Sequence, residues 1–261
     1  MLKSWCSVLL ISIISGAVST AMGGQPLETE SARLAARGTL KVEAGLERQT
    51  SADGSEANVP AALEYSPADR VEILVEPVVY TRIRDPHRTL ASGPGDFEVT
   101  ALMLARTEAR WAPAVAFAAE VKIPTARSRF IGSGKPDYTV YSIASKQWGA
   151  WDTHLNLAYA WIGRPPGVRI QNVYGFAVAV ERSLRRFDVV AEVLGNTAAL
   201  AEGQAAEGGE STVAPEVGGE ELVATVGGRF HVNDQVTLSL GGSYDNQRAV
   251  QVHPGITLRW R

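Results

Sequence analysis

The sequence predicts an all-β protein: a transmembrane, antiparallel, up-and-down β-barrel of about twelve strands after an N-terminal signal peptide. Three observations predict it: an export signal, apolar residues that recur with period two from Gly38 onward, and connections that alternate between short and long. Residues 1–23 are assigned to the signal peptide and 38–261 to the barrel. Residues 24–37 are assigned to a periplasmic segment, with the barrel mouth as one place for it.

The export signal comes first in the chain. Lys3 precedes an apolar run at residues 8–18, which leads into small residues. This order is typical of a secretory signal peptide, with cleavage expected after Ala21 or Gly23. A permanent membrane helix needs about 18 or more apolar residues, and serines break this run earlier.

Composition excludes several classes of protein. The chain has 25 basic and 28 acidic residues, a net charge of −3, which gives no positive field for nucleic acid. Its one cysteine, Cys6, lies inside the signal, so no disulfide and no thiolate metal site are expected in the mature chain. No later run is apolar enough to span a bilayer as a helix, so a mature chain in a membrane must form a barrel.

The strands follow from alternation along the chain. Apolar residues occupy every second position in 40–46, 71–77, 115–123 and 155–161. Strands of about ten residues suit a tilted membrane span. The predicted strands are 38–48, 57–66, 70–83, 96–107, 112–123, 137–147, 152–162, 173–183, 187–196, 221–231, 235–244 and 249–261.

The connections alternate in length, as they do in outer-membrane barrels, which have short periplasmic turns and longer outer loops. An even number of strands then leaves both termini in the periplasm. Trp111, Trp148 and Trp151 fall at predicted periplasmic ends and Trp161 at an outer end, which are the places of an aromatic girdle. The short links are 66–69, 109–111, 148–151, 184–186 and 233–235, and the long ones are 49–56, 84–95, 124–136, 163–172 and 197–220.

Two outer loops have a distinctive composition. Arg127, Arg129 and Lys135 could meet phosphate groups of outer-membrane lipid and lipopolysaccharide, or simply be solvated. Loop 197–220 is acidic and poor in large apolar residues, so we expect it to be mobile.

Short stretches throughout the mature chain resemble, in order and spacing, a family of outer-membrane barrels named after the meta-cleavage (MetA) pathway of phenol degradation. The resemblance implies the fold, the outer-membrane location and a transporter that takes up small molecules, aromatic or hydrophobic ones included. It implies no catalytic motif. The stretches are Pro26-Leu27, Gly95-Asp96, Pro113, residues 120–125, residues 132–134, Asp137-Tyr138, Ser145-Lys146, residues 154–156, Tyr174-Gly175, Glu181 and Glu192.

If the apolar set faces lipid, the alternate residues face the lumen. Charges of both signs would share this narrow interior, either as a structural network of ion pairs or as a polar conduit that selects solutes. The lumen-facing candidates are Glu43, Glu72, Glu76, Arg82, Arg106, Glu120, Lys122, Lys146, His154, Asn156, Glu181, Glu192, Arg229 and Arg259.

Catalysis and metal binding have little support. His154 and Asn156 share a face, as in outer-membrane lipid hydrolases, but no serine stands two positions from His154. A serine from another strand, such as Ser142 or Ser243, stays open. The histidines, at 87, 154, 231 and 253, are scattered over different segments. We therefore expect no metal, no cofactor and no covalent chemistry.

The sequence favours a passive outer-membrane channel. The alternatives are a structural or surface barrel with a plugged lumen, a membrane lipid hydrolase, and a secreted β-sandwich. The solute and the oligomeric state stay open.

Overall fold

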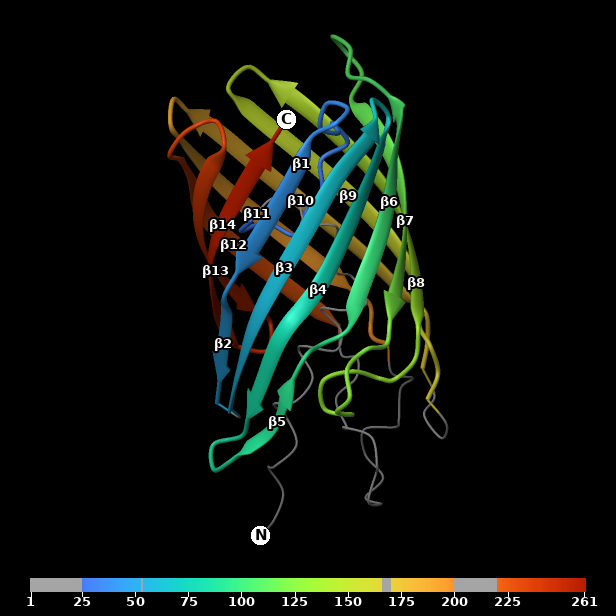
Figure 1. Cartoon of the computed structure of the whole chain (residues 1–261), viewed down its shortest axis with the longest axis vertical. Coiled ribbons are helices and arrows are strands. Elements are labelled where there is room, and N and C mark those ends of the chain that lie inside the picture. The colour runs from blue at the N-terminus through green and yellow to red at the C-terminus, as the bar shows by residue number, and fades with distance from the viewer. Residues whose placement is uncertain (1–24, 53, 166–169, 200–219) are drawn as a thin grey trace.

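The chain forms a closed antiparallel β-barrel, seen in a computed structural model that describes residues 25–52, 54–165, 170–199 and 220–261 (Figure 1). The predicted signal peptide and nearly all of loop 197–220 lie outside these residues. Among the described residues, no helix is long and apolar enough to cross a membrane. The predicted fold class is confirmed.

Within the part of the chain that the structure describes, fourteen strands build the sheet. Their bounds are β1 (Leu40–Gly45), β2 (Glu47–Ser51), β3 (Gly54–Ala68), β4 (Val71–Arg84), β5 (Thr89–Gly93), β6 (Phe97–Arg106), β7 (Ala114–Ile123), β8 (Asp137–Trp148), β9 (Trp151–Trp161), β10 (Val173–Leu184), β11 (Phe187–Asn196), β12 (Glu221–His231), β13 (Val236–Asp245) and β14 (Val250–Trp260).

These strands fill twelve positions around the barrel. β1 and β2 both pair with β3 and β14, so they are two parts of one interrupted strand, and β5 and β6 both pair with β4. Pairing of β1 with β14, with Leu40 opposite Trp260, closes the barrel. The predicted number of strands is therefore correct.

Two predicted loops are partly strand. β2 and β3 continue their ladder until Ser51 faces Gly54, and β5 pairs with the end of β4 inside the predicted loop 84–95. Main-chain hydrogen bonds extend these hairpins past the end of the period-two pattern, because pairing does not require an apolar face. Figure 1 shows these extensions at one end of the barrel, with the C-terminus at the other.

The end that carries the C-terminus has the short connections, and we call it the short-turn end; the opposite end is the long-loop end. At the short-turn end, Gly149 and Ala150 join β8 to β9, and Gly149 has a φ of 65°, which glycine adopts without strain. Trp111, Trp148 and Trp151 are exposed at the same end, as a membrane-interface girdle requires.

The two faces of the barrel wall differ in chemistry. On β9, Leu155 and Leu157 are exposed on the outside, whereas the side chains of His154 and Asn156 are buried inside. The other strands repeat this alternation, which gives the barrel an apolar outer surface.

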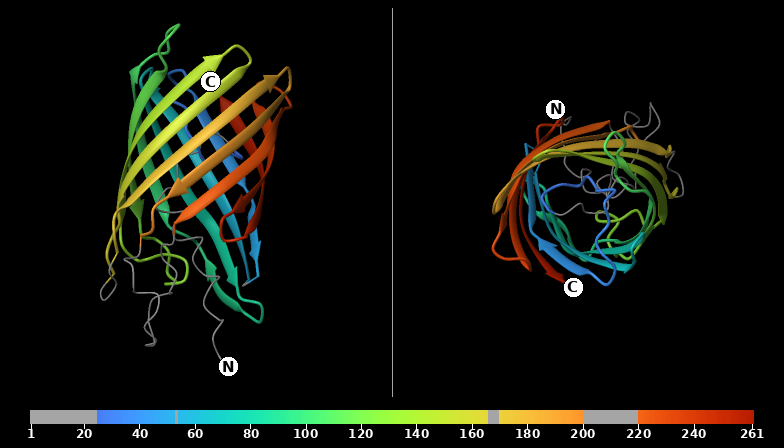
Figure 2. Two further views of the ribbon diagram at one scale, coloured as in Figure 1. Left: turned by 180° about the vertical axis from the view of Figure 1, so that it is seen from behind. Right: turned by 90° about the horizontal axis from the view of Figure 1, so that it is seen from above.

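The segment 25–36 runs inside the barrel along its inner wall, as the end-on view shows (Figure 2). It reaches the start of β1 through a turn in which Gly38 N donates to Ser66 O at 2.8 Å. The segment therefore occupies lumen space as well as the barrel mouth.

Candidate functional site: the barrel interior

Hydrogen bonds attach the segment 25–36 to the inner wall. Glu192 on β11 accepts from Glu28 N at 3.0 Å, from Thr29 N at 2.6 Å and from the Thr29 hydroxyl at 2.5 Å. Leu27 packs against Ala179 and Val190 beside these bonds. One carboxylate thus satisfies two main-chain donors that have no secondary structure to pair with.

The wall holds the rest of the segment in the same way. Ala32 N donates to Ser145 Oγ at 2.8 Å, and Ala35 N donates to Glu72 Oε2 at 3.1 Å. With its amide oriented to suit both partners, Asn156 donates to Glu30 O at 3.0 Å and accepts from Glu30 N at 2.7 Å.

Arg33 fixes the segment at the short-turn end. Its guanidinium pairs with Glu108 at 2.7 Å and also with Asp152. Lys146 reaches the same Glu108 at 2.6 Å. The hydrogen bond from Lys146 is the largest cause that holds the pKa of the Glu108 carboxyl below its usual value of 4.5, and the positive charges of Lys146 and Arg33 add to it.

Buried ion pairs occupy other parts of the inner wall. Lys41 lies 3.0 Å from Glu43 and 2.7 Å from Glu64. Arg229 pairs with Glu181 at 2.8 Å and also donates to Gln25 O at 2.8 Å. Each charge lies among hydrogen-bonding partners, which offsets part of its desolvation cost.

A serine does reach His154, but it is Ser145 on β8. Ser145 Oγ lies 2.8 Å from His154 Nδ1, while Ser142 points outward and Ser243 contacts His253. His154 Nε2 is 3.7 Å from Asp152 and 3.8 Å from Glu181, too far for hydrogen bonds. Ser145 is 1% exposed and lies under Ala32. The arrangement is that of a buried network that holds the segment in place.

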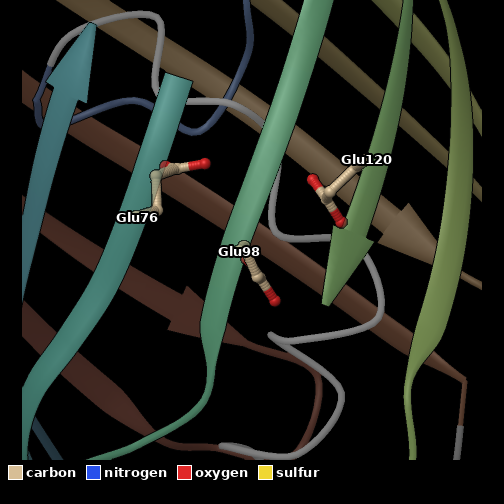
Figure 3. A group of neighbouring side chains, drawn as sticks. All are labelled: Glu76, Glu98 and Glu120. Carbon is tan, nitrogen blue, oxygen red and sulfur yellow. The ribbon is translucent and has the colours of Figure 1, made fainter. Parts of the chain in front are cut away.

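Three carboxylates converge farther along the wall. Glu76, Glu98 and Glu120 come from β4, β6 and β7, and a ligand oxygen of each lies within 4.8 Å of the others (Figure 3). Glu120 accepts hydrogen bonds from the Tyr141 hydroxyl at 2.9 Å and from Thr100 at 3.3 Å.

The interior also has an apolar side. Inward-facing residues of β3, β4 and β6–β10 pack into one cluster with Ala32 of the segment, and Leu34 of the segment packs against it. The wall residues with the largest side chains in this cluster are Leu74, Leu102, Tyr141, Ile143 and Val173.

A cavity of about 770 Å³ opens at the short-turn end. It lies between the segment and the wall, and its lining includes Glu30, Glu72, Lys41 and Arg259. Burial raises the pKa of Glu30, with further repulsion from Glu64. The volume is that of a typical small-molecule site.

Most of the predicted lumen residues lie on the inner face. All except Arg259 are buried or partly buried, whereas Arg259 is exposed at the edge of the cavity. These inner residues are Glu43, Glu72, Glu76, Glu120, Lys122, His154, Asn156, Glu181, Glu192, Arg229 and Arg259.

Three predicted lumen residues do not face the lumen. A bulge at Val79 inverts the alternation of β4, so Thr81 and Ile83 are buried and Arg82 is exposed. An irregularity between Leu104 and Arg106 does the same on β6, and Arg106 instead donates to Pro113 O.

Lys146 does not face the lumen for a different reason, which is its position in the alternation of β8. The buried residues of β8 are Asp137, Thr139, Tyr141, Ile143 and Ser145, so the next position belongs to the outer face. The Lys146 side chain extends over the turn after β6, where its ammonium donates hydrogen bonds to Glu108 and to Ala109 O.

The sequence prediction missed the partners that the segment brings, Thr29 and Arg33 above all, and two inner acids, Asp137 and Asp188. The two aspartates could have been found from their positions, because each alternates with the apolar residues of its strand. The segment has no period, so its position had no signal in the sequence.

The model of one family, described as "Putative MetA-pathway of phenol degradation", matches residues 23–259. The chain belongs to this family. No curated protein matches the chain.

Solved structures share the fold at low sequence identity. An outer-membrane channel from Pseudomonas putida F1 has a TM-score of 0.64 at 12% identity, over 88% of this chain and 98% of that one. The NanC porin has a TM-score of 0.57 at 11% identity, over 84% and 98%. The KdgM porin has a TM-score of 0.55 at 8% identity, over 85% and 99%. The architecture is thus that of outer-membrane porins.

Proposed function

We propose that the protein is a passive outer-membrane channel for small molecules, exported by its N-terminal signal and oriented with the short-turn end toward the periplasm. One observation carries the proposal: a closed barrel whose outer face is apolar and whose inner face is polar and charged. Such a wall is stable in lipid and leaves a hydrophilic interior. Membership of the family and the porin fold support it.

The interior favours neutral or cationic solutes with an apolar part. The family description names phenol degradation, which supports a solute with an aromatic part. Buried inner carboxylates outnumber buried inner cations among the described residues, which disfavours anions. The KdgM porin, by contrast, was solved with oligogalacturonate, a polyanion.

The segment 25–36 would set the width of the path. It lies on the inner wall and leaves the cavity of about 770 Å³ at the short-turn end. Solutes are expected to pass between it and the opposite wall.

At the long-loop end, we propose that Arg127, Arg129 and Lys135 contact phosphates of lipopolysaccharide. Arg127 and Arg129 are exposed in the connection between β7 and β8. Charge-assisted hydrogen bonds to phosphate would hold the barrel in its lipid leaflet.

A liposome-swelling assay tests the channel. The mature protein is refolded into liposomes and challenged with benzyltrimethylammonium or benzenesulfonate, ions of similar size and opposite permanent charge, and with arabinose. We expect arabinose and the cation to cause faster swelling than in protein-free liposomes, and the anion to cause slower swelling than the cation. Folded protein that gives no swelling with any solute would overturn it.

A structural barrel with a plugged lumen is the second candidate. The many bonds between the segment 25–36 and the wall favour it. It predicts no swelling for the wild type and a stable barrel all the same, so the same assay separates the two functions.

A further inference from the structure

The three carboxylates of Glu76, Glu98 and Glu120 belong to adjacent strands at one level of the barrel. Glu76 is directly opposite Glu98 in the ladder of β4 and β6, and Glu120 on β7 faces Thr100, two residues from Glu98. All three side chains are buried, and Figure 3 shows them on neighbouring strands, with Glu76 and Glu120 extending toward the strand that carries Glu98. Like charges this close repel strongly when their side chains are buried.

The nearest lysine is directed elsewhere. Lys122 lies opposite Glu98 in the ladder, but its ammonium pairs with Asp137 and lies 4.0 Å from Asp96. Its charge is therefore shared with two other acids.

A separate observation points to a missing partner. Glu76 Oε2 is buried and has no hydrogen-bond partner among the described residues. A buried carboxylate oxygen without a partner is costly. By contrast, Glu120 is satisfied by Tyr141 and Thr100, whose hydroxyls fix its orientation. Glu76 thus has an unpaired buried acceptor in the same group as Glu120, whose carboxylate is held in place.

From this geometry we infer that Glu76, Glu98 and Glu120 bind one divalent cation of the calcium class inside the barrel. Calcium takes six to eight oxygen ligands at about 2.3–2.6 Å in a tolerant geometry. Two such bonds on opposite sides of an ion span about 5 Å, which matches carboxylate oxygens that lie within 4.8 Å of one another. The hydroxyl of Thr100 and water could complete the shell.

Binding would link β4, β6 and β7 from the inside and remove the repulsion among the three acids. None of the hydrogen bonds described above joins the segment 25–36 to Glu76, Glu98 or Glu120. A bound cation would also make the local field less negative, which affects the preference of the path for charged solutes.

Terbium luminescence tests the site, since terbium replaces calcium at oxygen sites and is sensitised by a nearby tyrosine. The mature protein is refolded in detergent, freed of metal with a chelator and titrated with terbium under tyrosine excitation. Calcium is then added as competitor. The variants are Glu76→Gln, which removes one ligand charge, and Tyr141→Phe, which removes the adjacent sensitiser. Glu221→Gln, a carboxylate on β12 bonded to Asn196, is the control.

We expect terbium to bind saturably, with one ion per protein, and calcium to displace it at concentrations of about 1 mM or below, so that the emission falls. Glu76→Gln should weaken binding at least about tenfold, the expected size of losing one charged ligand of the ion. Tyr141→Phe should lower the emission, and Glu221→Gln should behave as wild type. Equal binding by wild type and Glu76→Gln, or no saturable binding at all, would overturn the inference.

Thermal unfolding gives a second measurement if emission is weak. Calcium should raise the midpoint of wild type and of Glu221→Gln more than that of Glu76→Gln, because a ligand stabilises the state that binds it. Without calcium, Glu76→Gln should be at least as stable as wild type, since it removes a repelling charge. A midpoint that rises equally with calcium in Glu76→Gln would contradict the site. Neither measurement depends on conductance, so failure here leaves the channel proposal intact.

Discussion

Adjacent residues of β9 lie on opposite faces of the barrel wall. Leu157 is 51% exposed on the outside, and its neighbour Asn156 is 2% exposed and bonded to Glu30. The outer position has no polar partner, so a charge there must be solvated by the bilayer itself.

Leu157→Arg should therefore lower the free energy of unfolding by about 2–4 kcal/mol if the residue lies near the bilayer midplane. Reversible urea unfolding in lipid vesicles, followed by tryptophan fluorescence, measures it. Leu157→Met is the control, because it changes the shape of the side chain but introduces no charge. An Arg variant as stable as the Met variant would place this residue outside the membrane.

Glu108 provides a pH test. Its pKa is lowered in the folded protein by Lys146 and Arg33, so its contribution to stability is present above the ordinary pKa of 4.5 and is lost as the pH falls through the lowered value. Glu108→Gln should be less stable than wild type at pH 7, by a small amount because the group is at the surface. The two proteins should converge in acid. A difference that stays the same from pH 7 to pH 3 in urea titrations would contradict these ion pairs.

Residue positions were predictable wherever a strand is regular. On β9 and β11 the period-two pattern predicts the inner face for His154, Asn156 and Glu192, and the structure has these side chains buried. It fails for Arg82, because the bulge at Val79 has no residue signature and inverts every position after it.

The segment 25–36 is the element whose position depends on side chains of the wall. Glu192 bonds two of its main-chain amides and the Thr29 hydroxyl. Glu192→Gln keeps the size but weakens these charge-assisted bonds. We expect faster hydrogen exchange at the amides of Glu28 and Thr29, with unchanged exchange in the β-strands. Glu221→Gln is again the control. Exchange at residues 28 and 29 that equals wild type would mean that other contacts hold the segment.

This element could not be placed from the sequence. Residues 24–37 were expected in the periplasm or at the barrel mouth, because nothing in them alternates. Their position follows from donors and acceptors that only the folded barrel brings together, such as Ala32 N with Ser145 on β8.

At the scale of the whole molecule, closure of the barrel was predictable and its interior only in part. Alternation and the lengths of connections predicted twelve strands, and pairing of β1 with β14 confirms the closure. The cluster of Glu76, Glu98 and Glu120 depends on register between strands, which the pattern of one strand does not contain.

Single-channel recording in a planar lipid bilayer tests the central claim most directly. Folded mature protein is added to one side, and conductance and reversal potential are measured in a salt gradient. A water-filled, carboxylate-rich lumen predicts discrete conductance steps and a reversal potential that shows cation preference. Inserted, folded protein that leaves the bilayer at its protein-free conductance would contradict the channel, and steps with anion preference would contradict the proposed field of the lumen.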